Sequence, residues 1–153
     1  MTTPTLFDWI GGMPALDRLT ERFYARVAQD RILAPVFEHM PANHPHHVAL
    51  FLAQIMGGPA EYSERHGGHP HMVAQHLNRR LTQEQRRQWI WLLLDTADEV
   101  GVPDDPEFRS AFVGYLEWGS RIAVINSQPG AAVDPTAPMP TWGWGEVKGP
   151  FKP

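Results

Sequence analysis

Hydrophobic residues recur every three or four positions along most of this chain, the spacing that places side chains on one face of an α-helix. The clearest stripe is Val48, Phe51, Leu52 and Ile55, which ends at Gly57-Gly58-Pro59. No segment alternates polar and apolar residues as a half-buried strand would. The pattern therefore predicts an all-α fold, with helices over residues 14–29, 45–56, 72–80, 82–100 and 105–126.

Residues typical of helix ends support two of these helices. Thr82 and Gln85 have the spacing of a capping box, and Gly101 follows the last turn of the same helix. Asp105 precedes Pro106, which suits an N-cap followed by a proline in the first turn. These two helices are the most sharply bounded that the sequence predicts.

Two segments lack helical periodicity. Residues 62–70 hold two histidines, two glycines and a proline, and we expect a loop there. Residues 129–153 contain six of the 15 prolines and the segment Trp142-Gly143-Trp144-Gly145. We therefore expect one compact domain over residues 1–128 and an extended C-terminal extension over residues 129–153.

Composition narrows the classes of function. A length of 153 residues suits one domain, and 42% hydrophobic residues suit a packed core. A net charge of −4 and a pI near 6.0 argue against nucleic acid and anionic membranes as partners. Cysteine is absent, which excludes thiolate chemistry and cysteine-held metals. With neither a signal peptide nor a spanning segment in the pattern, we expect a cytoplasmic protein.

Eight histidines are the main chemical feature of this cysteine-free chain. His76 stands apart, because it is expected inside a short helix with apolar company and with no other histidine on that helix. Spacing alone favours a hydrogen-bonded core histidine, but the aromatic residues of the other helices could wall a flat cofactor such as haem. Five others are expected to be solvated or to cap carbonyl groups: His39, His46, His66, His69 and His71.

The histidine clusters also allow a different class, a non-haem metal site in a helical bundle. A di-iron bundle would repeat a Glu-x-x-His pair on two helices, and no such repeat occurs in this sequence. The two classes differ in one observable, since only a haem protein shows a Soret absorption band.

Several short segments occur in an order and spacing that resemble one family. They are Arg22-Phe23-Tyr24 with Val27, Val36-Phe37, Phe51-Leu52 before the Gly57-Gly58-Pro59 stop, Tyr62-Ser63-Glu64, and Gly68-His69-Pro70. Over roughly residues 5–128 the chain resembles truncated haemoglobins of the second group. The resemblance implies a two-over-two helical sandwich around haem b.

The resemblance also implies roles for individual residues. His76 matches the proximal iron ligand, and Tyr24 and Trp89 match hydrogen-bond donors on the distal side. His44 falls at the distal position that many members fill with a small side chain, and His47 remains its rival because the alignment before Val48 is loose. The remaining residues expected to line the cofactor are Phe37, Val48, Phe51 and Met72. Phe37 departs from the family, since many members of the group carry a tyrosine there.

The function that follows is binding of dioxygen and other diatomic gases at a haem iron. Two or three donors over the ligand argue against rapid delivery of oxygen. Storage, sensing, nitric oxide oxidation and peroxide turnover stay open, and the redox reactions would need a reductase as partner. The sequence also leaves open whether the chain forms a homodimer.

Overall fold

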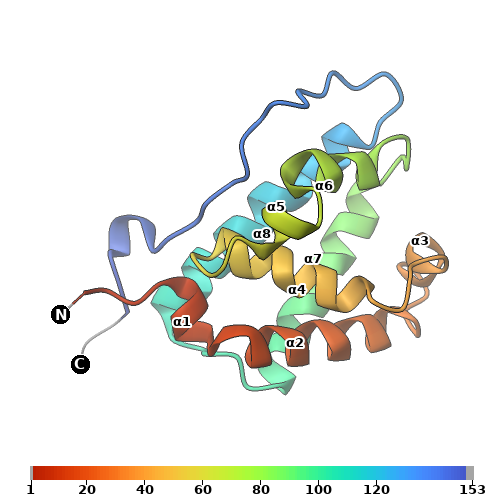
Figure 1. Cartoon of the computed structure of the whole chain (residues 1–153). Helices are drawn as coiled ribbons and strands as arrows, with labels where there is room; N and C mark the ends of the chain where they lie inside the picture. Colours follow the sequence, from red (N-terminus) through yellow and green to blue (C-terminus); the bar gives the residue numbers. More distant parts are fainter. Residues whose placement is uncertain (1, 151–153) are drawn as a thin grey trace.

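The computed structural model describes residues 2–150, and helices dominate this part of the chain (Figure 1). The α-helices are α1 (Leu6–Ile10), α2 (Gly12–Val27), α3 (Ala34–Phe37), α4 (His44–Ile55), α5 (Glu61–Arg65), α6 (Gly68–His76), α7 (Gln83–Glu99) and α8 (Pro106–Asn126). A 3-10 turn, η1 (Gly145–Val147), follows near the C-terminus. No strand occurs within residues 2–150, which agrees with the all-α prediction.

Two pairs of long helices form the body of the molecule. Helix α2 packs against α4, α7 packs against α8, and α2 also contacts α7 (Figure 1). The side chains between them are apolar and fully buried, including Leu16, Leu19, Phe23, Ile55, Leu93 and Phe108. This is the predicted two-over-two arrangement, and burial of the amphipathic faces provides most of the driving force for it.

The helix ends that the sequence marks most strongly are confirmed. The Thr82 hydroxyl accepts from the Gln85 backbone N–H at 3.1 Å, and the Gln85 side chain accepts from the Thr82 N–H at 3.0 Å. The Asp105 carboxylate accepts from the Phe108 N–H at 3.0 Å at the start of α8. Each contact satisfies a backbone donor that the first helical turn leaves unpaired.

The loop expected over residues 62–70 is wrong, because α5 and the first turn of α6 occupy most of it. The glycines there serve as a break between two short helices: Gly67 and Gly68 have φ of 85° and 62°. Helix α6 consequently begins and ends four residues earlier than the expected 72–80. His69 and His71 therefore share α6 with His76, contrary to the expectation that His76 is alone on its helix.

Besides α5, two further short helices were not predicted. Helix α1 has five residues, too few to display a period, although Thr5 and Asp8 form a capping box at its start. Helix α3 has four residues with a proline in its first turn. Both are short enough that packing, and not periodicity, determines them.

The segment after α8 runs back across the molecule to the N-terminal end (Figure 1). The backbone N–H of Trp142 donates to the Ile55 carbonyl at 2.8 Å, and the Trp144 indole donates to the Pro4 carbonyl at 2.8 Å. The Trp144 ring also packs edge-on against Trp9, with 5.9 Å between ring centroids. The division of the chain at residue 128 stays a prediction, but the described part of the extension is docked.

No helix within residues 2–150 combines the length and the hydropathy that crossing a membrane requires.

Candidate haem-binding site

Three aromatic rings from three elements meet at one end of α2. Tyr24, buried in the last turns of α2, packs edge-on against His44 of α4 with 4.8 Å between ring centroids. Phe37 of α3 lies 5.4 Å from Tyr24 and 6.0 Å from His44. These contacts bring together Tyr24, His44 and Phe37, which the sequence placed at the distal side of a cofactor.

The imidazole of His44 is half-buried, and its Nε2 atom is fully buried without a hydrogen-bond partner among the described residues. Burial lowers the pKa of His44 below its usual value, and the nearby charges of His47, Arg79 and His76 lower it further. The ring is therefore neutral at pH 7. An unpartnered buried nitrogen costs free energy, which makes this atom a candidate for contact with a ligand.

His76, the last residue of α6, has one ring nitrogen already engaged. Its Nδ1 lies 2.9 Å from the Met72 carbonyl oxygen, one turn earlier in the helix. Because a carbonyl only accepts, Nδ1 must carry the hydrogen, and Nε2 is left with a free lone pair. Burial lowers the pKa of His76, the Met72 bond opposes that shift, and Arg79 adds to it. The result is a neutral, oriented imidazole of the kind that metals bind.

Trp89 of α7 lies next to the same part of α2. Its ring packs edge-on against Phe23, with 5.6 Å between centroids. Burial raises the pKa of Tyr24 well above its usual range, and the nearby Trp89 indole opposes part of that rise. Both groups are thus neutral hydrogen-bond donors that lie close together.

His47, the rival of His44, faces another part of the molecule. Its ring lies 4.5 Å from that of His66, at the end of α5, and no ring contact joins it to Tyr24 within the described residues. Burial lowers the pKa of His47, and the charges of His66, His46 and His71 contribute. Three residues along a helix turn side chains by about 60° relative to each other, which separates the two histidines.

The remaining predicted lining residues are apolar and divide between the core and its edge. Phe51 is buried and packs edge-on against Tyr62 at 5.2 Å, while Val48 and Met72 are partly buried against the core. They supply an apolar surface to the same core cluster that contains Tyr24.

The histidines expected to be solvated or to cap carbonyl groups differ in their surroundings. His39 is exposed beside Glu38, and the exposed His46 lies 2.8 Å from Asp17, so both are solvated as expected. His69 does not fit that expectation, because its Nδ1 is buried without a partner in the first turn of α6. Within residues 2–150, no three His, Asp or Glu side chains are placed to share one metal ion.

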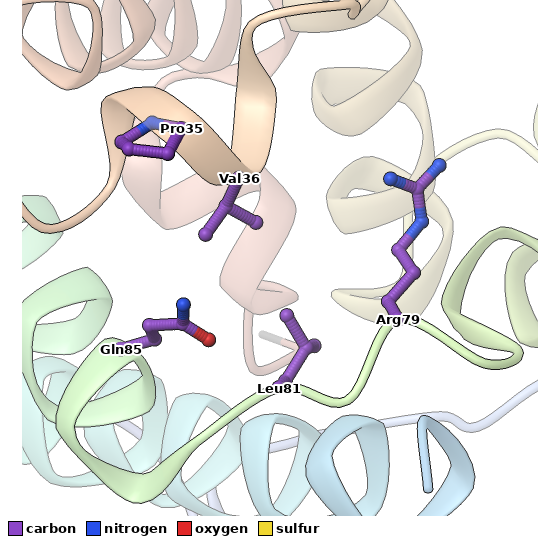
Figure 2. A pocket seen from close by; sticks show the side chains of 5 residues that line it. All are labelled: Pro35, Val36, Arg79, Leu81 and Gln85. Atoms are coloured by element: carbon purple, nitrogen blue, oxygen red, sulfur yellow. The ribbon is translucent and has the colours of Figure 1, made fainter. Parts of the chain in front are cut away.

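Arg79 was not predicted as a site residue. It follows α6 and lines a cavity of about 290 Å³ together with Pro35, Val36, Leu81 and Gln85 (Figure 2). Its charge acts on both His44 and His76. Nothing in the hydrophobic pattern marks it, because an exposed arginine after a helix is common.

The donors present suit a haem group. One neutral imidazole, His76, offers Nε2 to a metal, while the buried and unpartnered Nε2 of His44 needs a partner that the described protein residues do not supply. The aromatic rings of Tyr24 and Phe37 give the apolar surroundings that a flat macrocycle needs.

Comparison with known proteins agrees with this reading. The family model described as bacterial-like globin matches residues 5–117. The group 2 truncated hemoglobin YjbI of Bacillus subtilis is 36% identical over 117 residues, which cover 76% of this chain and 86% of that protein.

Solved structures show the same relationship. The group II truncated hemoglobin of Bacillus anthracis superimposes with a TM-score of 0.73 at 27% identity, covering 84% of this chain and 95% of that one. A truncated haemoglobin of Bacillus subtilis, described as oxygen-avid, gives a TM-score of 0.70 at 34% identity, covering 79% and 99%. The chain belongs to the bacterial-like globins and is a truncated haemoglobin of group II, a haem-binding globin family.

Proposed function

We propose that this protein binds haem b through Nε2 of His76 and retains dioxygen, or another diatomic gas, beside Tyr24, Trp89 and His44. The observation that carries the proposal is the orientation of His76. Its Nδ1–H bond to the Met72 carbonyl leaves Nε2 neutral and directed away from its own helix backbone. We assign this activity to the cytoplasm.

A bound haem would supply an iron that coordinates an imidazole and a diatomic gas. His76 provides the imidazole. The Met72 carbonyl fixes the ring by accepting from Nδ1–H, which limits rotation of the imidazole and strengthens it as a ligand. The lowered pKa of His76 keeps it deprotonated at Nε2 over the physiological range.

Tyr24 and Trp89 would donate hydrogen bonds to the gas. Dioxygen in such a site carries partial negative charge, and the phenol O–H and indole N–H are both able to donate to it. Each ring is anchored by packing, Tyr24 between Phe37 and His44 and Trp89 against Phe23. In a site with little water, each donor contributes about 1 to 3 kcal/mol to retention.

His44 is the third polar group of the distal side. Its neutral ring has one N–H to donate, and its Nε2 has no protein partner in the described chain. Its ring contact with Tyr24 supports His44 over His47 as the distal histidine. A comparison of His44→Leu with His47→Leu separates the two, because only the distal histidine should change the release of dioxygen.

Several donors around one gas molecule favour slow release over rapid delivery. The Bacillus subtilis relative is described as oxygen-avid, and we propose the same property for this chain. Slow release suits storage or sensing, and it also suits oxidation of nitric oxide when a reductase returns the iron to its ferrous state.

Three measurements test the proposal. Titration of the apoprotein with haem b should produce a Soret band that saturates at one haem per chain, and the ferrous form should bind dioxygen with slow release. A protein that gains no Soret band would contradict haem binding. Consumption of nitric oxide with a supplied reductant would show the redox reaction, and its absence would leave gas retention as the function.

A further inference from the structure

The segment after α6 holds Arg79 in a defined position. Asn78 and Arg80, on either side of it, have φ of 60° and 53°, a left-handed conformation that non-glycine residues adopt at a cost in free energy. Two hydrogen bonds tie the segment to the end of α8: the Arg80 N–H donates to the Ser127 carbonyl and the Leu81 N–H to the Ser127 hydroxyl, both at 2.9 Å. The surrounding structure therefore fixes where the Arg79 side chain begins.

The guanidinium of Arg79 has unused hydrogen-bonding capacity. Its Nε donates to the Gln75 carbonyl, and within residues 2–150 its terminal nitrogens have neither a carboxylate nor another acceptor. Five other arginines of the described chain do have carboxylate partners: Arg22, Arg26, Arg86, Arg109 and Arg121. Arg79 therefore retains the fork of donors that binds a planar carboxylate.

The surroundings of Arg79 suit a ligand that is apolar but carries a charged edge. The cavity of about 290 Å³ that it lines has the apolar side chains of Pro35, Val36 and Leu81, the amide of Gln85, and no acidic residue (Figure 2). Besides burial, the charge of Arg79 is among the causes that lower the pKa of both His44 and His76. The cation thus lies near both sides of the candidate haem site.

We infer that Arg79 binds one of the two propionate carboxylates of the haem and thereby anchors the carboxylate-bearing edge of the group in this cavity. The inference rests on the proposed haem function and adds a residue to it. An exposed guanidinium suits this role, because the propionates are the charged, water-facing edge of an otherwise apolar group. The apolar residues across the cavity then cover the macrocycle next to that edge.

The test measures the rate of haem release from the loaded protein to a haem-scavenging apoprotein. The variants are Arg79→Gln, Arg79→Lys and, as the matched control, the neighbouring exposed Arg80→Gln. Each is loaded with haem b and, separately, with haem dimethyl ester, in which both propionates are neutral. Arg79→Gln should release haem b about tenfold faster than wild type, Arg79→Lys should restore part of the loss, and Arg80→Gln should match wild type.

The ester distinguishes a propionate from other anions and from packing. With the ester, wild type and Arg79→Gln should release the group at the same rate. Equal acceleration for haem b and its ester would overturn the inference, because Arg79 would then act through packing or through a free anion. Equal rates for Arg79→Gln and Arg80→Gln would also overturn it, while an intact Soret band in the same samples would leave the proposed function standing.

Discussion

Two aromatic regions of this molecule differ in whether their polar atoms have hydrogen-bond partners. Where the extension docks, two indole N–H groups have partners: Trp144 donates to the Pro4 carbonyl and Trp9 to the Asp105 carboxylate at 2.9 Å. At the site around Tyr24, the Nε2 of His44 is buried with no partner. Both regions bury rings, but only one leaves hydrogen-bonding capacity unused.

The difference separates a structural contact from a binding site. A satisfied polar group inside a protein adds a modest net stabilisation, while an unsatisfied one costs free energy until something binds it. The two indole N–H groups where the extension docks have protein partners and need no ligand. The buried Nε2 of His44 gains a partner only when a ligand binds. Substitutions should therefore change stability in the first region and ligand binding in the second.

The largest effect should come from His76→Gly, which removes the proposed iron ligand. Haem should be lost at least a hundredfold faster than from wild type, because only apolar contacts and the proposed Arg79 contact would hold the macrocycle. Added imidazole should restore much of the wild-type spectrum by occupying the space left by the side chain. The control is His71→Ala, an exposed histidine of the same helix, and a comparable haem loss in that variant would remove the assignment from His76.

Substitution of Trp144 should affect the other region. Trp144→Ala loses its packing against Trp9 and its bond to Pro4, and the free energy of unfolding should fall by roughly 2 kcal/mol, less than for a fully buried ring. Trp91→Ala, which removes a ring that is 59% exposed, should change it by less than about 0.5 kcal/mol. Oxygen release should be unaltered in both, and a faster release from Trp144→Ala would show that the two regions are coupled.

The distal donors should alter ligand release with little effect on stability. Tyr24→Phe and Trp89→Phe should each speed the release of dioxygen by about tenfold, equivalent to about 1.4 kcal/mol. The two effects should not add, because the donors share one ligand. Stopped-flow release of dioxygen and carbon monoxide provides the measurement, with Tyr115→Phe, a buried tyrosine of α8, as control.

Carbon monoxide carries less charge than dioxygen when bound and should respond more weakly to both substitutions. If the release of the two gases accelerates equally, Tyr24 and Trp89 obstruct the exit by their size and do not act as hydrogen-bond donors.

The smallest effect concerns pH. The pKa values of His44 and His76 are lowered in the folded protein, so the unfolded chain binds more protons below pH 6.5. The free energy of unfolding of the apoprotein should therefore be highest above that pH and decrease as the pH falls from 6.5 through the folded pKa values, by at most about 1.4 kcal/mol per pH unit for each group. His44→Leu should weaken this dependence, and an unchanged urea-unfolding profile in that variant would show that His44 does not contribute.

The sequence predicted the structure best where apolar side chains recur at helical spacing or where a side chain caps a helix end. The helix beginning after Thr82 was predictable because its capping box is local and its apolar face is long. The pairing of Tyr24 with His44 was also within reach, since counting helical turns back from Phe51 selects His44. Local rules therefore predict the helices, while the roles of the residues at the candidate site rest on the resemblance to truncated haemoglobins.

Other features depend on contacts that no local rule contains. The sequence could not place His69 on the same helix as His76, because the glycines read equally well as a loop and as a break between helices. The position of Arg79 depends on the hydrogen bonds between Ser127 and the neighbouring Arg80 and Leu81. Its cavity depends on a wall formed by α3. Such sites are created by tertiary structure.

The most direct measurement is a crystal structure of the haem-loaded protein with a diatomic ligand. We predict that His76 Nε2 binds the iron and that the polar atoms of Tyr24 and Trp89 lie within about 3.2 Å of the ligand, with His44 on the same side. A structure with His47 over the iron, or with the Tyr24 hydroxyl and the Trp89 indole bonded only to protein groups, would contradict it.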